Sequence, residues 1–439
     1  MSIARIAVLG GNVEAALTAA VLARSLTRQT EAVLHPEAGT PQPEPALVTL
    51  PSYNRLHELL SFDVRDVLRA CGGTLRGGTV YRRLSSREFT TGFGEDLPAA
   101  DGHSFHQHWL RLHRDEEARL WADYQLAARL AEGGHMPLLT PSQEGFGLHL
   151  DYRLYTDFLR RAAVHYGART LDSTSPTDGD DLQSLDADLV IDCSERQLPT
   201  SDPDWHSVPG SPVEWKEVAT PENPSATVFE RQGKEVAVHV PLAQGGWVGA
   251  WNLGAAGVNG WSEGPWRGKV VRLGPAACRL SPLAGPRLRI AQIGIEALLK
   301  LLPVGGPGEA ERGEYARVTT EGYKRLHEHE ELHLALAGEL PQPSTDVQRK
   351  IEQFRSRGRV VLFDEESYTA EEHLAVYDGY GVVPDRYSKA LHAVPPGVSR
   401  ALLDKQLRDT ERKLADTPPQ KQVLSTLHRR RSPQERPGS

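Results

Sequence analysis

The chain has 439 residues and a formal net charge of −8; 25% of its residues are charged and 39% are apolar. This composition is typical of a folded chain with two or three domains and argues against a collagen-like, coiled-coil or mostly disordered protein. No apolar run approaches the roughly 18 residues of a membrane-spanning helix, and the negative charge argues against nucleic acid as a partner.

The N-terminal residues predict a strand, a helix and a second strand. An apolar run at residues 3–9 stops at Gly10 and Gly11, a helical pattern covers 13–25, and a second apolar run lies at 32–34. This spacing is that of a β-α-β unit.

Helical and strand patterns continue along the chain. Apolar residues at helical spacing predict helices over residues 53–70, 104–132, 151–166 and 287–302, and in most of the chain after residue 315. Strand patterns predict a buried strand at 186–194, an antiparallel sheet over 200–262 and a short strand at 269–273. The basic tail, residues 429–439, is predicted to be disordered.

The cysteines and the N-terminus bear on the compartment. Cys71, Cys193 and Cys278 are widely spaced and form no C-x-x-C pair, which argues against a disulfide framework or a cysteine zinc site. The first residues lack the basic region and long apolar core of a signal peptide. We therefore expect a cytoplasmic protein with no membrane partner.

The turn after the first strand is a candidate dinucleotide site. A dinucleotide fingerprint places glycines where the chain turns, where the pyrophosphate approaches and where helix packs on strand. The three positions here are Gly10, Asn12 and Ala15, and His35 stands where the acidic ribose ligand is expected. The alternative is an ordinary β-α-β turn.

His329-Glu330-Glu331-Leu332-His333 is an H-E-x-x-H sequence. On a helix it places two imidazoles on one face beside a carboxylate that can activate water, as in zinc hydrolases. The neighbourhood is also rich in His and Glu, as a solvated helix face is. We expect no metal here and keep a zinc hydrolase as the least favoured hypothesis.

Aromatic residues cluster in two places. His108 and Trp109 lie in one helical stretch, and Trp247 follows a glycine pair in the predicted sheet. Such residues either fill a core or line a pocket for a flat aromatic small molecule.

Over nearly its whole length the chain resembles the flavin-dependent tryptophan halogenases. The resemblance rests on the stretches Phe105-His-Gln-His-Trp109, Leu148-His-Leu-Asp151, Ala187-Asp-Leu-Val-Ile-Asp192-Cys193-Ser194 and Gly379-Tyr-Gly381-Val-Val-Pro384. It also includes Trp266-Arg-Gly-Lys-Val-Val-Arg-Leu-Gly274-Pro-Ala-Ala277.

The resemblance implies an α/β fold of the FAD-dependent monooxygenase kind, in three parts. These are a discontinuous Rossmann-type nucleotide-binding domain (1–40, 145–200 and 265–305), a substrate-binding sheet domain (41–144 and 201–264) and a C-terminal helical cap (306–428). In the family, reduced FAD and oxygen oxidise halide to hypohalous acid, which reaches a lysine beside the bound indole, where a glutamate assists.

The positions that carry this chemistry have changed. The family lysine position is Arg76, whose guanidinium stays protonated and offers no amine lone pair. The family stretch Pro-Leu-Glu-Ser/Ala-Thr-Gly aligns with residues 282–287, so the family glutamate position is Ala284 and the family glycine position is Arg287. We therefore predict no catalytic residue.

The resemblance places FAD on Gly10, Gly11, Asn12, Ala15, Gly274, Ala276 and Ala277, and an aromatic substrate near His108, Trp109 and Trp247. Glu195 replaces the glycine that follows Asp-Cys-Ser, and Pro275 interrupts Gly-Asp-Ala-Ala. We therefore expect FAD to bind weakly or not at all.

The favoured hypothesis is a tryptophan halogenase homologue that has lost halogenation and serves as partner or scaffold of an intact paralogue. The C-terminal helices over 346–427, rich in tyrosine, are its expected contact region, unless those tyrosines fill the cap's own core. The alternative is an active FADH2- and oxygen-dependent halogenase or monooxygenase in which Arg76 orients the oxidant.

Overall fold

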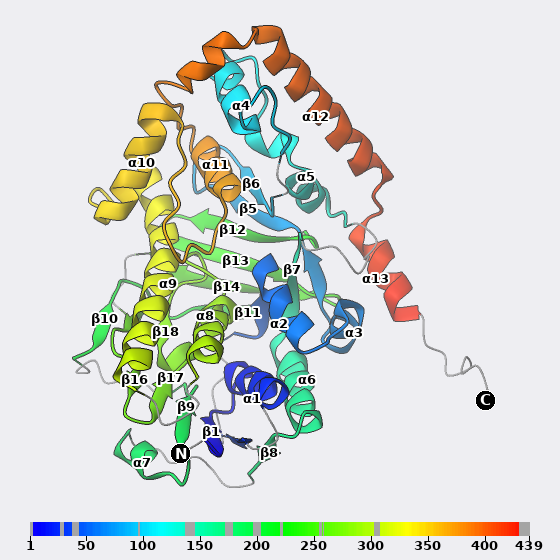
Figure 1. Cartoon of the computed structure of the whole chain (residues 1–439). Coiled ribbons are helices and arrows are strands. Elements are labelled where there is room, and N and C mark those ends of the chain that lie inside the picture. The colour runs from blue at the N-terminus through cyan, green and yellow to red at the C-terminus, as the bar shows by residue number, and fades with distance from the viewer. Residues whose placement is uncertain are drawn as a thin grey trace. The chain divides into compact units, whose positions relative to one another are not determined.

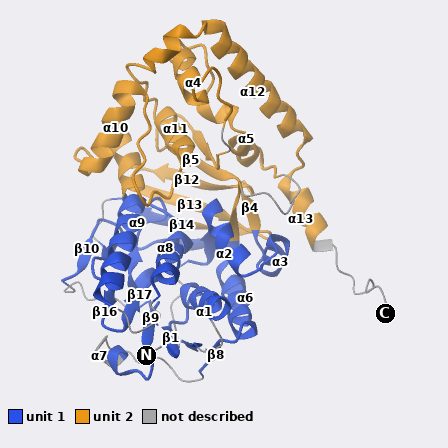
Figure 2. Cartoon of the chain, viewed as in Figure 1, with its two compact units in different colours: residues 1–73, 150–216, 249–327 blue, residues 74–149, 217–248, 328–439 orange. Residues whose placement is uncertain are grey.

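The computed structural model describes residues 3–26, 30–36, 44–94, 97–136, 145–171, 179–195, 203–219, 223–253, 257, 259–302 and 308–429 (Figure 1). The chain divides into two compact units, unit 1 with residues 1–73, 150–216 and 249–327, and unit 2 with residues 74–149, 217–248 and 328–439 (Figure 2). Unit 1 takes in more of the chain than the predicted nucleotide-binding domain, and the predicted cap is shared between the units. The predicted tail lies outside the described residues from position 430 on.

A mostly parallel sheet forms the centre of unit 1. Its strands, in spatial order, are β16 (Trp266–Arg267), β17 (Val270–Arg272), β9 (Leu189–Asp192), β1 (Arg5–Leu9), β2 (Glu31–His35) and β8 (Arg169–Thr170). β1 pairs in parallel with both β2 and β9, and only β16 runs antiparallel to its neighbour. A small antiparallel sheet contains β10 (Trp205–Ser207), β15 (Gly260–Ser262) and β18 (Cys278–Arg279).

Helices cover this sheet. α1 (Val13–Ser25) packs against α6 (Tyr152–His165), β2 and α8 (Arg287–Leu301). Figure 1 shows α1 beside α6. The remaining elements of unit 1 are β3 (Ala46–Val48), η1 (Pro51–Tyr53), α2 (Asn54–Leu59), α3 (Val64–Ala70), α7 (Gly179–Ser184) and η3 (Gly274–Ala276).

The sequence predicted most of these elements because their apolar residues recur at the spacing of a strand or a helix. Residues 6–9 of β1 are buried and apolar, and Asn12 caps α1 by accepting a hydrogen bond from the Ala15 N–H at 3.0 Å. The β-α-β unit and the α/β fold class are confirmed. The single helix predicted over 53–70 is wrong, because the chain turns at Ser61 (φ 55°) and Asp63 caps a new helix, α3.

Unit 2 contains a mixed sheet. In it β5 (Gly78–Arg82) pairs antiparallel with β6 (Phe89–Gly92) and parallel with β12 (Ala226–Gln232), which pairs antiparallel with β13 (Glu235–Pro241). β4 (Thr74–Arg76) pairs antiparallel with β7 (Gly147–Asp151). The elements through which the division between the units passes are β7, β11 (Glu214–Val218), β14 (Gly246–Asn252) and α9 (Glu309–Leu336).

The helices of unit 2 pack on one another and on this sheet. α11 (Ala370–Gly379) and α5 (Leu126–Gly133) contact β6, and α12 (Pro396–Asp416) contacts α4 (Phe105–His113) and α5. The other helices are η2 (Trp121–Tyr124), α10 (Thr345–Arg357), η4 (Lys389–Ala393) and α13 (Gln420–Arg429). In the described part of the chain, no helix is both long and apolar enough to cross a membrane.

Candidate functional site

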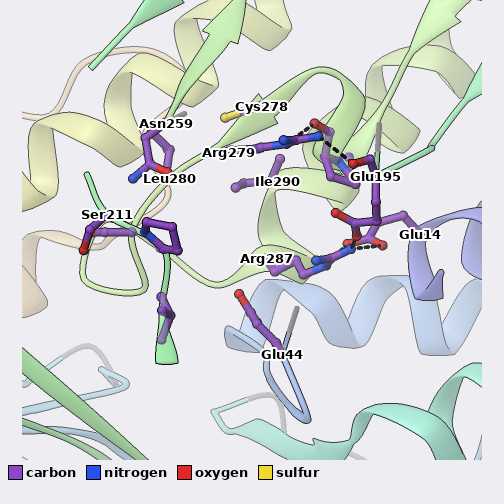
Figure 3. A pocket seen from close by; sticks show the side chains of 16 residues that line it. Glu14, Glu44, Glu195, Ser211, Asn259, Cys278, Arg279, Leu280, Arg287 and Ile290 are labelled. Carbon is purple, nitrogen blue, oxygen red and sulfur yellow. Dashed lines mark hydrogen bonds and ion pairs between the residues drawn. The ribbon is translucent and has the colours of Figure 1, made fainter. Parts of the chain in front are cut away.

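The candidate site lies beyond the carboxyl ends of β1 and β9. In an open parallel sheet, ligands bind where the chain leaves adjacent strands in opposite directions, and β1 lies between β2 and β9. Gly10 follows β1 with φ +134°, and a Cβ there would lie 3.2 Å from the Ala15 Cβ, so the turn requires glycine. A pocket of about 300 Å³ opens at this end of unit 1 (Figure 3).

The pocket brings together the two segments that were predicted to bind the cofactor. Gly274, at φ +60°, lies so close to the first turn of α1 that a Cβ would stand 2.8 Å from the Glu14 Cγ. Gly274 and Pro275 line the pocket with Glu14, and Ala276 and Ala277 continue the same turn. Gly11 adjoins the site, and its carbonyl accepts a hydrogen bond from Arg160. His35 lies elsewhere, in a second pocket that Arg5 and Arg169 also line.

Two backbone donors in the first turn of α1 are already engaged. The Val13 N–H donates to the Tyr152 hydroxyl at 3.3 Å, and the Ala15 N–H donates to Asn12 Oδ1. The Asn12 side chain also donates to the Cys193 carbonyl at 2.5 Å. Anions bind helix N-termini through free N–H groups, and Asn12 and Tyr152 occupy two of them here.

A buried ion cluster forms the floor of the pocket. Arg287, the first residue of α8, donates from Nε and Nη2 to the two carboxylate oxygens of Glu14, the Nη2 contact at 2.8 Å, and its Nη2 also reaches Glu195. The Glu14 side chain is 0% exposed, and those of Arg287 and Glu195 are 12% and 13% exposed. Figure 3 shows the Arg287 side chain meeting Glu14, with Glu195 nearby. We call these three residues the ion cluster.

The pKa values in the ion cluster follow from burial and pairing. Burial raises the pKa of Glu14, and Arg287 opposes that rise. Burial alone would lower the pKa of Arg287, but the two carboxylates outweigh it and raise the pKa well above its usual range. The cluster therefore places one guanidinium between two carboxyl groups in a site that is largely removed from water.

Glu44 adds a third carboxyl group to the pocket wall. Burial raises its pKa to about 7, a net effect in which Arg287 lowers it and Glu14 and Glu195 raise it further. The other guanidinium in the wall belongs to Arg279, which donates to the backbone carbonyls of Pro275 and Glu195 at 3.0 and 3.2 Å. These residues do not fit a dinucleotide pyrophosphate, because three carboxyl groups line the pocket, its two guanidiniums are already engaged, and the N–H groups of Val13 and Ala15 are already bonded.

Arg76, at the family lysine position, is a buried residue of unit 2. It is 4% exposed, and it donates from Nε to Thr227 Oγ1 at 2.8 Å and from Nη2 to Thr79 Oγ1 at 2.6 Å. The ring of Phe93 lies 4.6 Å from its guanidinium carbon. His149 extends this network, since its ring nitrogens lie 3.0 Å from Thr227 Oγ1 and 2.8 Å from Thr74 Oγ1. Arg76 is thus built into the packing of the sheet.

Ala284, at the family glutamate position, is completely buried in unit 1. Its N–H bonds to the Ser281 carbonyl at 3.1 Å, and its methyl group cannot accept or donate a proton. The structure instead places a carboxyl group near Arg76 that the sequence did not single out. Glu372, in the first turn of α11, is 6% exposed, and burial raises its pKa to about 7, while hydrogen bonding to Thr369 and the charge of Arg76 oppose the rise.

The predicted aromatic pocket residues differ in exposure. Trp109 is 1% exposed, its indole N–H donates to the Arg119 carbonyl, and its ring stacks on His113. Both ring nitrogens of His108 are engaged, with the Ser399 hydroxyl and the Ala100 carbonyl. Trp247, in β14, is half-buried. A role in substrate binding stays a prediction for all three.

The H-E-x-x-H residues lie on α9 and are buried. The His329 ring stacks on Tyr368 with centroids 3.7 Å apart, and His333 Nδ1 contacts the Tyr380 hydroxyl at 3.1 Å. Glu330 is 6% exposed. Within the described ranges, no group of three or more His, Cys, Asp or Glu side chains is placed to hold a metal ion.

Comparison with known proteins identifies the family. The sequence profile described as tryptophan halogenase matches residues 5–198 and 256–396. The chain belongs to the tryptophan halogenase family. The comparison with curated protein sequences gives no match.

Solved flavin-dependent halogenases share this family fold. Xcc4156 from Xanthomonas campestris has a TM-score of 0.87 at 21% identity, covering 97% of this chain and 99% of its own. BrvH from Brevundimonas sp. BAL3 has a TM-score of 0.85 at 23% identity, with the same coverage. Tar14, a tryptophan C-6 halogenase from taromycin biosynthesis, has a TM-score of 0.83 at 17% identity over 96% of this chain and 99% of its own.

Sequence reasoning missed the ion cluster, although two of its members were visible as departures from the family pattern. Glu195 and Arg287 both stand where the family pattern has glycine, and they carry opposite charges. Their opposite charges were the feature of the sequence from which the pairing could have been predicted. The sequence did not indicate that Glu14, Glu44 and Glu372 are buried, because acidic residues early in a helix or in a loop are ordinarily exposed to water.

Proposed function

We propose that this chain has lost flavin-dependent halogenation and acts as a non-catalytic partner of an intact member of its family. The observation that carries the proposal is the ion cluster in the pocket beyond β1 and β9. Two of its charged side chains occupy positions at which the family pattern has glycine.

Weak FAD binding follows from charge and from engaged donors. A pyrophosphate entering the pocket meets the carboxylates of Glu14 and Glu195 and finds the N–H groups of Val13 and Ala15 already bonded. An uncompensated polar group costs on the order of 1–3 kcal/mol, and about 2.7 kcal/mol weakens binding about 100-fold. Two such costs add to about 2–6 kcal/mol, which corresponds to weakening on the order of 100-fold or more.

The chemistry positions support the same proposal. Arg76 is held by Thr79 and Thr227 inside the sheet, and its guanidinium cannot form a chloramine. Ala284 has no group that could assist. A chain that keeps the family fold but lacks these groups can still bind another protein, and this is the simplest function left to it.

An active flavin-dependent halogenase or monooxygenase is the second candidate, and one observation favours it. Glu372 and Arg76 interact electrostatically inside unit 2, and a buried carboxyl with a pKa of about 7 is suited to general acid–base chemistry. In that case Arg76 orients the oxidant and Glu372 replaces the lost glutamate.

FAD titration separates the two candidates. The purified chain is expected to be colourless and to bind FAD only weakly in a fluorescence-quenching titration. Glu195→Gly leaves the Glu14–Arg287 pair intact, removes one carboxylate, and is expected to tighten FAD binding at least about 10-fold, since one tenfold step is 1.4 kcal/mol. Glu263→Gly, which removes an exposed carboxylate of unit 1, is the matched control and leaves the affinity unchanged. Stoichiometric yellow flavin in the purified wild type would overturn the proposal.

The partner is tested separately. The tyrosines expected at an interface are partly used inside unit 2, since Tyr377 is 0% exposed and stacks on Phe354, and Tyr368 stacks on His329. Co-expression with an intact family member, followed by size-exclusion chromatography with light scattering, is expected to give a complex. Strictly monomeric elution at tens of micromolar contradicts the partner role.

A further inference from the structure

Another pocket, within unit 2, is lined by basic residues. It has a volume of about 680 Å³ and lies between the end of α10, the start of α11 and the segment leading into η4. Arg357, Arg359, Arg386 and Lys389 line it, and all four side chains belong to exposed residues. In the parts of the chain that the structure describes, Glu371 is the acidic residue in its wall. We call it the basic pocket.

The charge of the basic pocket opposes that of the chain. The whole chain carries a net charge of −8, yet four cations gather here around one carboxylate. Among the described residues, these four cations have no ion-pair partner, whereas many other arginines of unit 2 are paired, such as Arg87 with Asp378 and Arg400 with Glu117. Unpaired like charges repel one another, and a bound anion would relieve that repulsion.

Hydrogen bonds hold the walls together. The Gln107 side chain accepts from the Ser388 N–H at 2.7 Å and donates to the Gly358 carbonyl at 3.4 Å, so one residue of α4 joins two walls. Gly358 ends α10 at φ +62°, which places Arg357 and Arg359 on either side of the turn. The Asp385 N–H bonds to the Arg355 carbonyl at 2.7 Å and fixes the segment that carries Arg386.

The remaining wall residues suit a flat group. Val360 and Leu374 are apolar, and Tyr387 is a half-buried ring that also lines the pocket. An aromatic ring can stack on tyrosine while its charged part meets guanidinium groups, which recognise phosphate through paired hydrogen bonds. The volume is within the range of small-molecule sites.

We propose that the basic pocket binds a phosphate-bearing aromatic ligand of the nucleoside diphosphate class. Arg359 and Arg386 contact the phosphates, Tyr387 stacks on the base, and Gln107 keeps the walls in place. This site is separate from the one beyond β1 and β9 and does not depend on the loss of flavin chemistry.

Isothermal titration calorimetry of the full-length chain with ADP tests the proposal. ADP is expected to bind with a dissociation constant below about 1 mM, which corresponds to about 4 kcal/mol, and to bind more weakly as salt is added. Arg359→Gln/Arg386→Gln is expected to weaken binding at least about 100-fold, since each charged hydrogen bond is worth a factor of about 10 or more and the two factors multiply. Lys405→Gln/Arg408→Gln, on the exposed side of α12, removes the same charge and leaves binding unchanged.

Three results would overturn the proposal. ADP binding that survives Arg359→Gln/Arg386→Gln but responds to Glu195→Gly places the nucleotide in unit 1. Inorganic pyrophosphate that binds as tightly as ADP shows a simple anion site with no aromatic recognition. Poly-glutamate that binds where ADP does not shows a surface for acidic protein segments. A thermal-shift measurement without ligand confirms that the Arg359→Gln/Arg386→Gln variant is folded.

Discussion

Replacing Arg287 by methionine tests the ion cluster most directly. The substitution keeps an unbranched, flexible side chain, although a shorter one, and removes the cation between the two carboxyl groups. Glu14 is 0% exposed, so its carboxylate is left with no counter-ion in a site that excludes water. Breaking a buried pair by removing one partner costs about 3–5 kcal/mol. We expect Arg287→Met to lower the free energy of unfolding by that amount at pH 8.

The loss of stability caused by Arg287→Met should grow as the pH rises. Without Arg287, burial holds the pKa of Glu14 further above the ordinary value of 4.5. A carboxyl group whose pKa is higher in the folded than in the unfolded state costs no stability below its unfolded pKa. It lowers the free energy of unfolding progressively as the pH rises through its folded pKa. The deficit of Arg287→Met should therefore be largest at pH 8 and shrink toward pH 5, where Glu14 takes up a proton.

Urea denaturation followed by tryptophan fluorescence at pH 5 and pH 8 measures this. Arg267→Met is the matched control, because Arg267 and Asp204 form an ion pair in unit 1 whose side chains are 49% and 37% exposed. An exposed pair is worth about 0–1 kcal/mol. The double variant Glu14→Gln/Arg287→Met should recover part of the loss. If Arg287→Met and Arg267→Met were equally stable at pH 8, the ion cluster would not be the desolvated arrangement described here.

Three further changes test other parts of the structure. Glu44→Gln should stabilise the chain at pH 8 by at most about 3 kcal/mol but not at pH 5. The reason is that a folded-state pKa near 7 makes the folded state lose stability as the pH rises, and thermal melts at both pH values measure the difference. Thr227→Val should cost about 2–4 kcal/mol because it leaves Arg76 Nε and His149 Nε2 without their hydroxyl partner, and a milder effect in urea melts would contradict the network. Arg76→Lys/Ala284→Glu should give no halogenated tryptophan with reduced flavin, oxygen and halide, because such residues act as a unit; product above the flavin-free background by mass spectrometry would refute this.

The elements of unit 1 were predictable because their sequence is locally periodic. Residues 6–9 of β1 form an unbroken apolar run, α1 follows a capping residue, and the parallel register of β1 with β2 follows from the β-α-β connection. The break between α2 and α3 was not predicted, since the apolar pattern runs through it. One capping aspartate, Asp63, outweighed that periodicity by satisfying the N–H of Arg65.

The sequence predicted where the candidate site lies but not which side chains meet there. The glycine turn located it, and the resemblance marked Glu195 as a departure. The partner of Glu195 lies 92 residues away in the sequence and that of Glu14 lies 273 residues away, both being Arg287. Contacts over such separations depend on tertiary packing, which local patterns of charge and hydrophobicity do not encode.

The ion cluster also explains why the departures at 195 and 287 belong together. Glu195 alone would add a second carboxyl group beside the buried Glu14, and without Arg287 the two would repel each other in a poorly hydrated site. With Arg287 in place, the loss of Glu195 leaves a one-to-one pair, whereas the loss of Arg287 leaves the buried Glu14 without its cation and Glu195 with the charge of Arg279. Restoring the family glycine is therefore tolerable at position 195 and destabilising at position 287. A single substitution can thus loosen the pocket, but full restoration of the family site requires Glu14, Glu195 and Arg287 to change together.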